Sequence, residues 1–174
     1  MKSFGMGALS TTESFELGVN VYTSDFVTSD DGWERNFGAT PVITFNETSA
    51  SGVDGMLQIV YPGGTNSSSR VHILPSDFDI PLPTTEKKYY FKMSIECEGD
   101  SDKMPMVRAY AGLPGAYFSN KDVTPNTLYT FSGQYTKTMT STIRLVIEFT
   151  NGTGSSSFGD TKIRIKDIGW YYYD

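Results

Sequence analysis

Three carboxylates lie close together in the sequence, at Glu96, Glu98 and Asp100, and form its densest acidic cluster. A pair of carboxylates, one acting as acid and one as base or nucleophile, is what glycoside hydrolysis needs. The alternating residues around this cluster place Glu96 and Glu98 on one face of a strand that runs into a turn. We expect a solvated strand end here, and catalysis is the less favoured alternative.

The chain has one histidine, His72, and one cysteine, Cys97. One cysteine excludes an internal disulfide, and one histidine excludes a metal site built from several histidines. A Ser-His-Asp triad would have to use His72, and no G-x-S-x-G motif accompanies it. The residues therefore offer no credible catalytic set outside the acidic cluster.

Alternation of apolar and polar residues with a period of two dominates the chain and predicts strands that are buried on one face. The pattern is strongest at residues 89–98, 142–150 and 162–166. Weaker strand patterns cover residues 15–22, 41–45, 55–61, 70–74, 106–111 and 128–135. We find no apolar stripe at helical spacing.

Clusters of Gly, Pro, Asn and Asp separate these segments and are typical of tight turns. About nine short strands with such turns between them predict an all-β fold, an antiparallel β-sandwich or jelly roll. No repeat or linker is visible, so we expect one domain over residues 1–174, with residues 1–12 as a flexible N-terminal segment.

The 174 residues carry 20 acidic and 14 basic side chains, which gives a net charge of −6. This balance argues against nucleic acid and against an anionic membrane surface as partners. Aromatic residues make up 14% of the chain, which argues against disorder. The N-terminus has no apolar segment of the signal-peptide kind. We expect either a protein that stays inside the cell or a domain taken from an exported parent.

Several short patterns, in order along the chain, resemble carbohydrate-binding modules of the family 4/9/22 type, which are known as xylan-binding parts of xylanases. Ser14-Phe15-Glu16 is similar to the N-terminal Phe-Glu of that family, and Gly32-Trp33-Glu34-Arg35-Asn36 to its Gly-Trp-x-x-Arg stretch. The strand patterns at 132–136 and 144–148 and the closing segment 158–168 also resemble family segments.

The resemblance implies a two-sheet jelly roll whose concave sheet binds one polysaccharide chain. A planar tyrosine ring suits the C–H face of a sugar, and carboxylate or guanidinium groups suit its hydroxyls. Outward-facing residues of the predicted strands supply further candidates, although a solvated face or core packing remains the alternative for each. The candidate carbohydrate-binding residues are Trp33, Arg35, His72, Arg108, Tyr110, Tyr117 and Glu148.

The resemblance also implies a structural calcium ion held by Glu16 and Asp167, since hard oxygen ligands suit Ca²⁺. The expected function is non-catalytic binding of a β-1,4-linked plant cell-wall glycan, with neutral xylan as first choice, by a monomer attached to an exported glycoside hydrolase. The exposed members of the C-terminal aromatic run would then contact that parent enzyme. A small jelly-roll hydrolase or lyase and a structural or adhesion sandwich are the alternatives.

Overall fold

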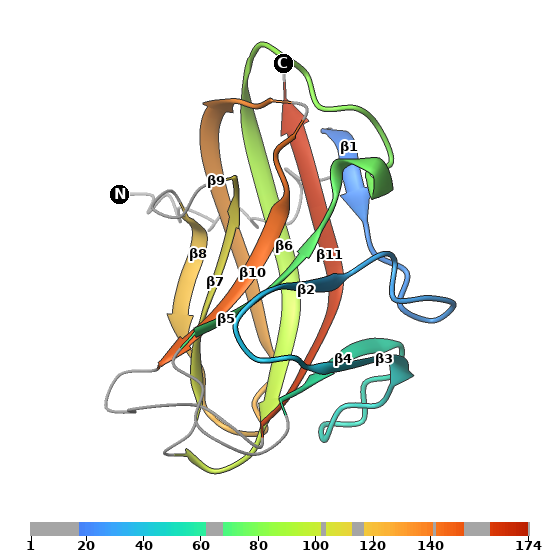
Figure 1. Cartoon of the computed structure of the whole chain (residues 1–174), viewed down its shortest axis with the longest axis vertical. Coiled ribbons are helices and arrows are strands. Elements are labelled where there is room, and N and C mark those ends of the chain that lie inside the picture. Colours follow the sequence, from blue (N-terminus) through green and yellow to red (C-terminus); the bar gives the residue numbers. More distant parts are fainter. Residues whose placement is uncertain are drawn as a thin grey trace, which may run out of the picture.

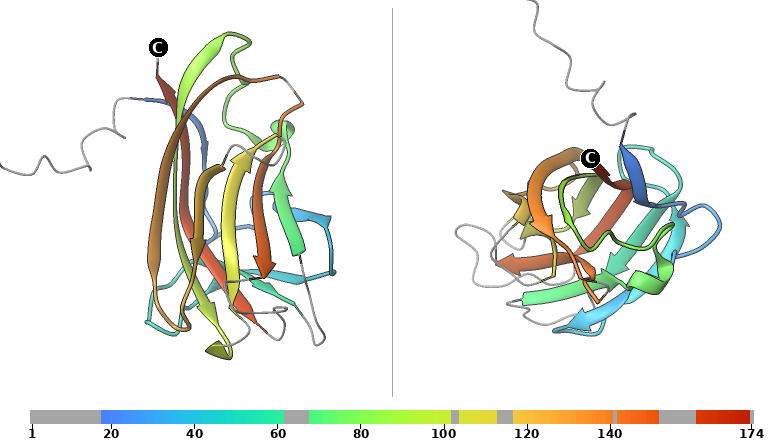
Figure 2. Two further views of the ribbon diagram at one scale, coloured as in Figure 1. Left: turned by 90° about the vertical axis from the view of Figure 1, so that its left-hand side faces the viewer. Right: turned by 90° about the horizontal axis from the view of Figure 1, so that it is seen from above.

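Two antiparallel sheets pack face to face, as Figures 1 and 2 show. The computed structural model describes residues 18–61, 68–101, 104–112, 117–140, 142–151 and 161–173, but not the side chains of 117–121 and 151. Most of the later connections cross from one sheet to the other, which is jelly-roll connectivity. The predicted all-β sandwich is confirmed, whereas the flexible segment 1–12 lies outside the described residues.

The first sheet is built around two long strands, β6 (Glu86–Glu98) and β11 (Lys162–Tyr173). Its order is β3-β4-β11-β6-β9, and β1 also pairs with β11. The other strands of this sheet are β1 (Val19–Thr23), β3 (Val42–Glu47), β4 (Met56–Val60) and β9 (Tyr129–Thr138).

The second sheet has the order β2-β5-β10-β7-β8. Its strands are β2 (Glu34–Phe37), β5 (Ser68–Ile73), β7 (Pro105–Ala111), β8 (Tyr117–Asp122) and β10 (Leu145–Asn151). A short 3₁₀ turn, η1 (Pro75–Asp77), follows β5. No helix among the described residues is long and apolar enough to cross a membrane.

The core lies between the sheets and follows the alternation of the sequence. On β6, the side chains of Tyr89, Phe91, Met93, Ile95 and Cys97 are all fully buried. The inward residues of β10 and β11 pack against the same core, and so do both tryptophans. Each buried aromatic side chain removes a large apolar area from water, so this core is the main source of stability.

Two strands, β2 and β8, were not predicted. Both lie at the edges of the second sheet, where strands are short and their alternation is weak. The last strand also extends further than predicted, to Tyr173. A bulge between Lys166 and Gly169 restores the alternation there, so that Ile168 and Trp170 face the core.

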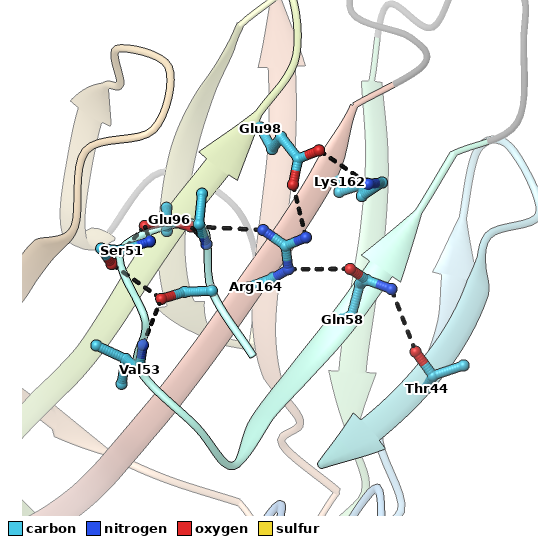
Figure 3. Close-up of polar contacts among 10 residues, drawn as sticks. Thr44, Ser51, Val53, Gln58, Glu96, Glu98, Lys162 and Arg164 are labelled. Carbon is cyan, nitrogen blue, oxygen red and sulfur yellow. Dashed lines mark hydrogen bonds and ion pairs between the residues drawn. The ribbon is translucent and has the colours of Figure 1, made fainter. Parts of the chain in front are cut away.

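The predicted solvated strand end at Glu96 and Glu98 is wrong for Glu96, which is fully buried. The segment between β3 and β4 covers its carboxylate (Figure 3). Glu96 accepts hydrogen bonds from the backbone amide of Ala50 (2.7 Å) and from the hydroxyl of Ser51 (2.7 Å). Arg164 Nη1 lies 3.4 Å from the same carboxylate. Glu96 thus anchors a loop, and its burial between these donors excludes it as an open catalytic acid.

Arg164 is the centre of a polar network on the outer face of the first sheet. Its Nη2 donates to Glu98 (2.6 Å) and its Nε donates to the side-chain oxygen of Gln58 (2.9 Å). Lys162 donates to the other oxygen of Glu98 (2.8 Å), and these two cations hold the pKa of Glu98 below its usual range. The network joins β4, β6 and β11 through side chains as well as through backbone bonds.

We expect Arg164→Met to lower the free energy of unfolding by about 3–5 kcal/mol, because it leaves the buried Glu96 carboxylate without its cation. Lys162→Met is the matched control. The Lys162 side chain is 45% exposed and its partner Glu98 is 35% exposed, so the loss of this pair should cost less than about 1 kcal/mol. Urea unfolding of both variants measures the difference. Equal losses would show that Glu96 does not depend on Arg164.

Candidate functional site

The outer face of the second sheet carries a row of charged side chains across three neighbouring strands. Glu148 on β10 lies opposite Arg70 on β5 and opposite Arg108 on β7. Arg70 donates from Nε to Glu148 Oε1 (3.0 Å), and its Nη2 is also 3.0 Å from that oxygen. Arg108 Nη1 lies 3.7 Å from Glu148 Oε2. The antiparallel register therefore places one carboxylate between two guanidinium groups.

Burial differs sharply along this row. The Glu148 side chain is 4% exposed, while those of Arg70 and Arg108 are 27% and 25% exposed. Arg70 also lies over the ring of Phe37 on β2, with Cζ 5.1 Å from the ring centroid. Glu148 thus acts as a positioning residue that fixes two arginines, and the arginines are the groups that solvent or a ligand reaches.

A second row lies one step along the same strands, where His72 pairs with Val146 on β10 and with Glu34 on β2. Arg144 Nη1 donates to His72 Nδ1 at 3.5 Å, so Nδ1 is an acceptor and Nε2 carries the proton. His72 Nε2 then donates to Glu34 Oε1 at 2.9 Å. The imidazole lies between an arginine and a carboxylate, and its bond to Glu34 is the shorter of the two.

A cavity of about 510 Å³ opens on this face and is bounded by the connection between β9 and β10. This volume falls within the range of small-ligand sites. The apolar part of the lining includes Tyr110, Ile143 and Val146. Hydroxyl, amide and cationic groups surround it: Asn36, Arg70, Lys137, Thr138, Thr140, Thr142 and Arg144.

Two predicted binding residues are buried, and a third, Arg35, is exposed but does not share the face of Glu148. Trp33 is 2% exposed and its indole N–H donates to the hydroxyl of Tyr22 (2.8 Å), so it is a core residue and the prediction of a sugar platform is wrong. His72 is 3% exposed and has partners on both ring nitrogens, so its predicted contact with sugar is wrong as well. Arg35 pairs with the inward-facing Val71 and donates to the carbonyl of Gly38. The structure therefore does not bring Arg35 to the face that carries Glu148.

Three of the four remaining predicted residues, Arg108, Tyr110 and Glu148, lie on the outer face, with different exposure. Arg108 joins the charged row, as described above. Tyr110 lines the cavity but is only 1% exposed, so its ring is packed and is not an open stacking surface. Tyr117 begins β8 and pairs with Tyr110, and its side chain lies outside the described residues. Stacking by Tyr117 stays a prediction.

Sequence reasoning missed Arg70 and Lys137. The alternation of β5 carried a signal for Arg70, because Val71 and Ile73 face the core and therefore place Arg70 beside His72 on the outer face. Lys137 gave no such signal. It comes from β9 of the other sheet and reaches this face at Gly112. Its Nζ lies 3.6 Å from the point where a Cβ atom on Gly112 would be.

Calcium binding by Glu16 and Asp167 also stays a prediction, because Glu16 lies outside the described residues. Asp167 adopts a left-handed backbone at the β11 bulge (φ 52°) and its side chain is 60% exposed. The hydroxyl of Ser94 donates to it (3.3 Å), and the Lys166 ammonium lies 3.9 Å away. Within the described ranges, no three residues of the metal-ligating types form a group. Asp167 with its lysine does not by itself make a calcium site.

Comparison with known proteins shows the fold. No protein-family model and no curated protein matches the chain. Among solved structures, the CBM22-1 xylan-binding domain of Paenibacillus barcinonensis Xyn10C is 14% identical, with a TM-score of 0.62, over 89% of this chain and 95% of that domain. The CBM22-1–GH10 part of Clostridium thermocellum Xyn10B, in complex with xylohexaose, is 12% identical with a TM-score of 0.60, over 91% of this chain and 29% of that chain.

The same sandwich also occurs outside these modules. The enzymatically active domain of tailspike protein 4 from bacteriophage CBA120 is 8% identical with a TM-score of 0.56, over 89% of this chain and 22% of that one. At such identities, similarity establishes architecture and leaves the function to the side chains. The chain has the β-sandwich fold found in family 22 carbohydrate-binding modules, as the sequence resemblance predicted.

We expect Glu148→Gln to lower the free energy of unfolding by about 1–3 kcal/mol, because the amide cannot replace the charge-assisted bond to Arg70 or offset two neighbouring cations. Thr150→Val is a control at the next outward position of β10. The buried Thr150 hydroxyl oxygen has no hydrogen-bond partner in the described part of the chain, so the valine should be neutral or slightly stabilising. Urea unfolding measures both, and a Glu148→Gln variant as stable as the native chain would contradict this account.

For calcium, we expect the melting temperature to be higher in millimolar Ca²⁺ than in excess EDTA, because an ion bound only to the folded chain stabilises it by mass action. Differential scanning calorimetry of the full chain tests this expectation, with millimolar Mg²⁺ as control. Identical melts in Ca²⁺ and EDTA would remove calcium from the description of the fold.

Proposed function

We propose that this chain is a non-catalytic polysaccharide-binding module. It binds a β-1,4-linked glycan chain, with xylan as first choice, on the outer face of the second sheet. The observation that carries the proposal is the cavity beside the Arg70–Glu148–Arg108 row, where hydroxyl, amide and guanidinium donors surround an apolar floor. Such a mixture suits a sugar, which presents hydroxyl groups around a less polar ring.

The fold supports the same proposal. The structures with the same architecture include a xylan-binding domain and a module seen in complex with xylohexaose. Those ligands belong to those proteins. The present chain shares their sandwich and has a cavity on one outer sheet face, so a β-1,4-linked chain is the first ligand to test.

The carboxylates of the acidic cluster and of the binding face support a non-catalytic role. Glu96 is buried against Arg164 and a loop, and Glu148 is held by Arg70. The exposed carboxylate of Glu98 bonds Lys162 and Arg164. A glycosidase needs two carboxyl groups that face the scissile bond together, and these three are committed to cations on two different sheets.

A weakly binding, non-catalytic module is useful when it holds an attached enzyme near its polymer substrate. We therefore propose that this chain is a monomeric module of a larger, exported glycoside hydrolase. The C. thermocellum structure, in which a CBM22 module and a GH10 module occur together, supports this arrangement.

We expect the full chain to bind xylohexaose with a Kd between about 1 μM and 1 mM and to release no reducing ends from xylan. Thr142→Trp should weaken binding by about tenfold, because Thr142 is an exposed residue of the cavity lining and a large ring fills the space. Thr136→Trp is the control, since Thr136 is exposed on β9 beside Lys88, on the outer face of the other sheet. Isothermal titration calorimetry measures all three proteins.

Two results would overturn the proposal. Reducing ends released by the purified chain would show an enzyme. Equal affinities of wild type and Thr142→Trp would place the glycan away from this cavity.

A further inference from the structure

The charge of the proposed binding face is opposite to that of the whole protein. The chain carries 20 acidic and 14 basic residues. On the outer face of the second sheet and at its rim, however, four cationic side chains gather: Arg70, Arg108, Lys137 and Arg144. Three acidic residues have outward positions on this sheet: Glu34, Glu148 and, at the end of β8, Asp122.

The cavity itself is more one-sided than the face around it. Among the described residues that line it, Arg70, Lys137 and Arg144 are cationic and none is acidic. Two carboxylates of the same outer face have other partners. Glu148 is buried under its bond to Arg70, and Glu34 accepts a hydrogen bond from His72 Nε2. The described lining of the cavity is therefore cationic, while Glu148 and Glu34 bond to neighbouring side chains of the sheet.

Arg144 is the cation best prepared to bind an anion here. It is exposed, it lines the cavity, and its Nη1 lies 3.5 Å from His72 Nδ1. One bond through a single nitrogen leaves the other edge of the guanidinium group able to receive a ligand. A planar guanidinium group binds a carboxylate or sulfate through two parallel hydrogen bonds, which is stronger than its bonding to a neutral hydroxyl.

Glu148 offsets the charge of Arg70, but no acidic residue in the described lining offsets the charge of Arg144 or Lys137, and a neutral sugar adds no negative charge. An anionic group offsets the charge of these two cations, and the low-dielectric walls of the cavity strengthen the attraction. Guanidinium and ammonium groups also bind neutral hydroxyls, as Asn, Gln, Ser and Thr do, but their charge contributes fully only toward an anion. The charge is explained if the ligand is itself charged.

We propose that the glycan bound by this chain carries anionic groups, and that Arg144 and Lys137 bind them in the cavity. The group is a carboxylate of a uronic acid or a sulfate ester, which share the oxygen geometry that a guanidinium group recognises. This inference rests on the proposed function and replaces the expectation of a neutral chain. Binding then depends on salt, which it would not for neutral xylan.

The test compares matched ligands on the full chain by isothermal titration calorimetry at about 50 mM and 500 mM NaCl. The ligands are xylotetraose, xylotetraose with one glucuronic acid branch, and xylotetraose with one sulfate ester. We expect the acidic ligands to bind at least about tenfold more tightly than the neutral one at low salt, the size expected for one charge-assisted bond. The stronger of the two acidic ligands identifies the anionic group.

Variants locate the effect. Arg144→Gln should remove most of the preference for the acidic ligands, because the amide keeps hydrogen-bond donors but lacks the charge. Lys88→Gln removes the same charge from the outer face of the first sheet, where Lys88 is exposed and pairs with Thr136, and should leave the preference intact.

The outcomes separate the two proposals. If neutral and acidic ligands bind wild type equally at both salt concentrations, the ligand charge is irrelevant and this inference fails, while the proposed glycan binding stands. If none of the three ligands binds, the proposed function itself fails. If Arg144→Gln and Lys137→Gln both keep the full preference, or Lys88→Gln loses it equally, the anion does not bind in this cavity and the inference is overturned.

Discussion

The burial of β10 against the core is the constraint on which the binding face depends. Leu145, Ile147 and Phe149 are fully buried between the sheets. Because side chains alternate along a strand, Val146 and Glu148 must then face outward. Strands β5 and β7 bond to both edges of β10, and their own inward residues fix the register. The position of each charged group on the outer face is thus set by apolar contacts on the other side of the same strands.

Each sheet has one buried glutamate on its outer face that positions the groups bonded to it. On the first sheet, Glu96 holds the segment between β3 and β4 and bonds Arg164. On the second sheet, Glu148 holds Arg70 and lies near Arg108. A buried carboxylate is costly unless cations or donors surround it, so each one specifies the position of its partners. The first arrangement closes a loop over the sheet, and the second keeps two arginines in place beside an open cavity.

The charge of this protein is distributed unevenly over its surface. Its acidic residues outnumber its basic ones, yet the cavity lining contains cations. The summed charge of a protein governs solubility and distant attraction, while the local field of a cavity governs which ligand enters it. The net charge argues against a large basic surface and says nothing about a pocket of this size.

The sequence by itself determined which side chains face inward and which face outward on the strongly alternating strands. It predicted the buried face of β6 and the outward position of Glu148, because alternation with a period of two is a local property of the chain. The weak alternation of the edge strands β2 and β8 carried too little of that signal. Their existence depends on pairing with β5 and β7, which no local pattern encodes.

Only the tertiary structure decided what each outward residue contacts. Glu96 bonds a loop 46 residues away, and Arg70 bonds a carboxylate 78 residues away. The same alternation that places both glutamates outward does not distinguish one covered by a loop from one that fixes arginines at a cavity. Strand register and loop position decide which glutamate is covered. Both depend on the packing of distant segments around one shared core, which no local sequence pattern encodes.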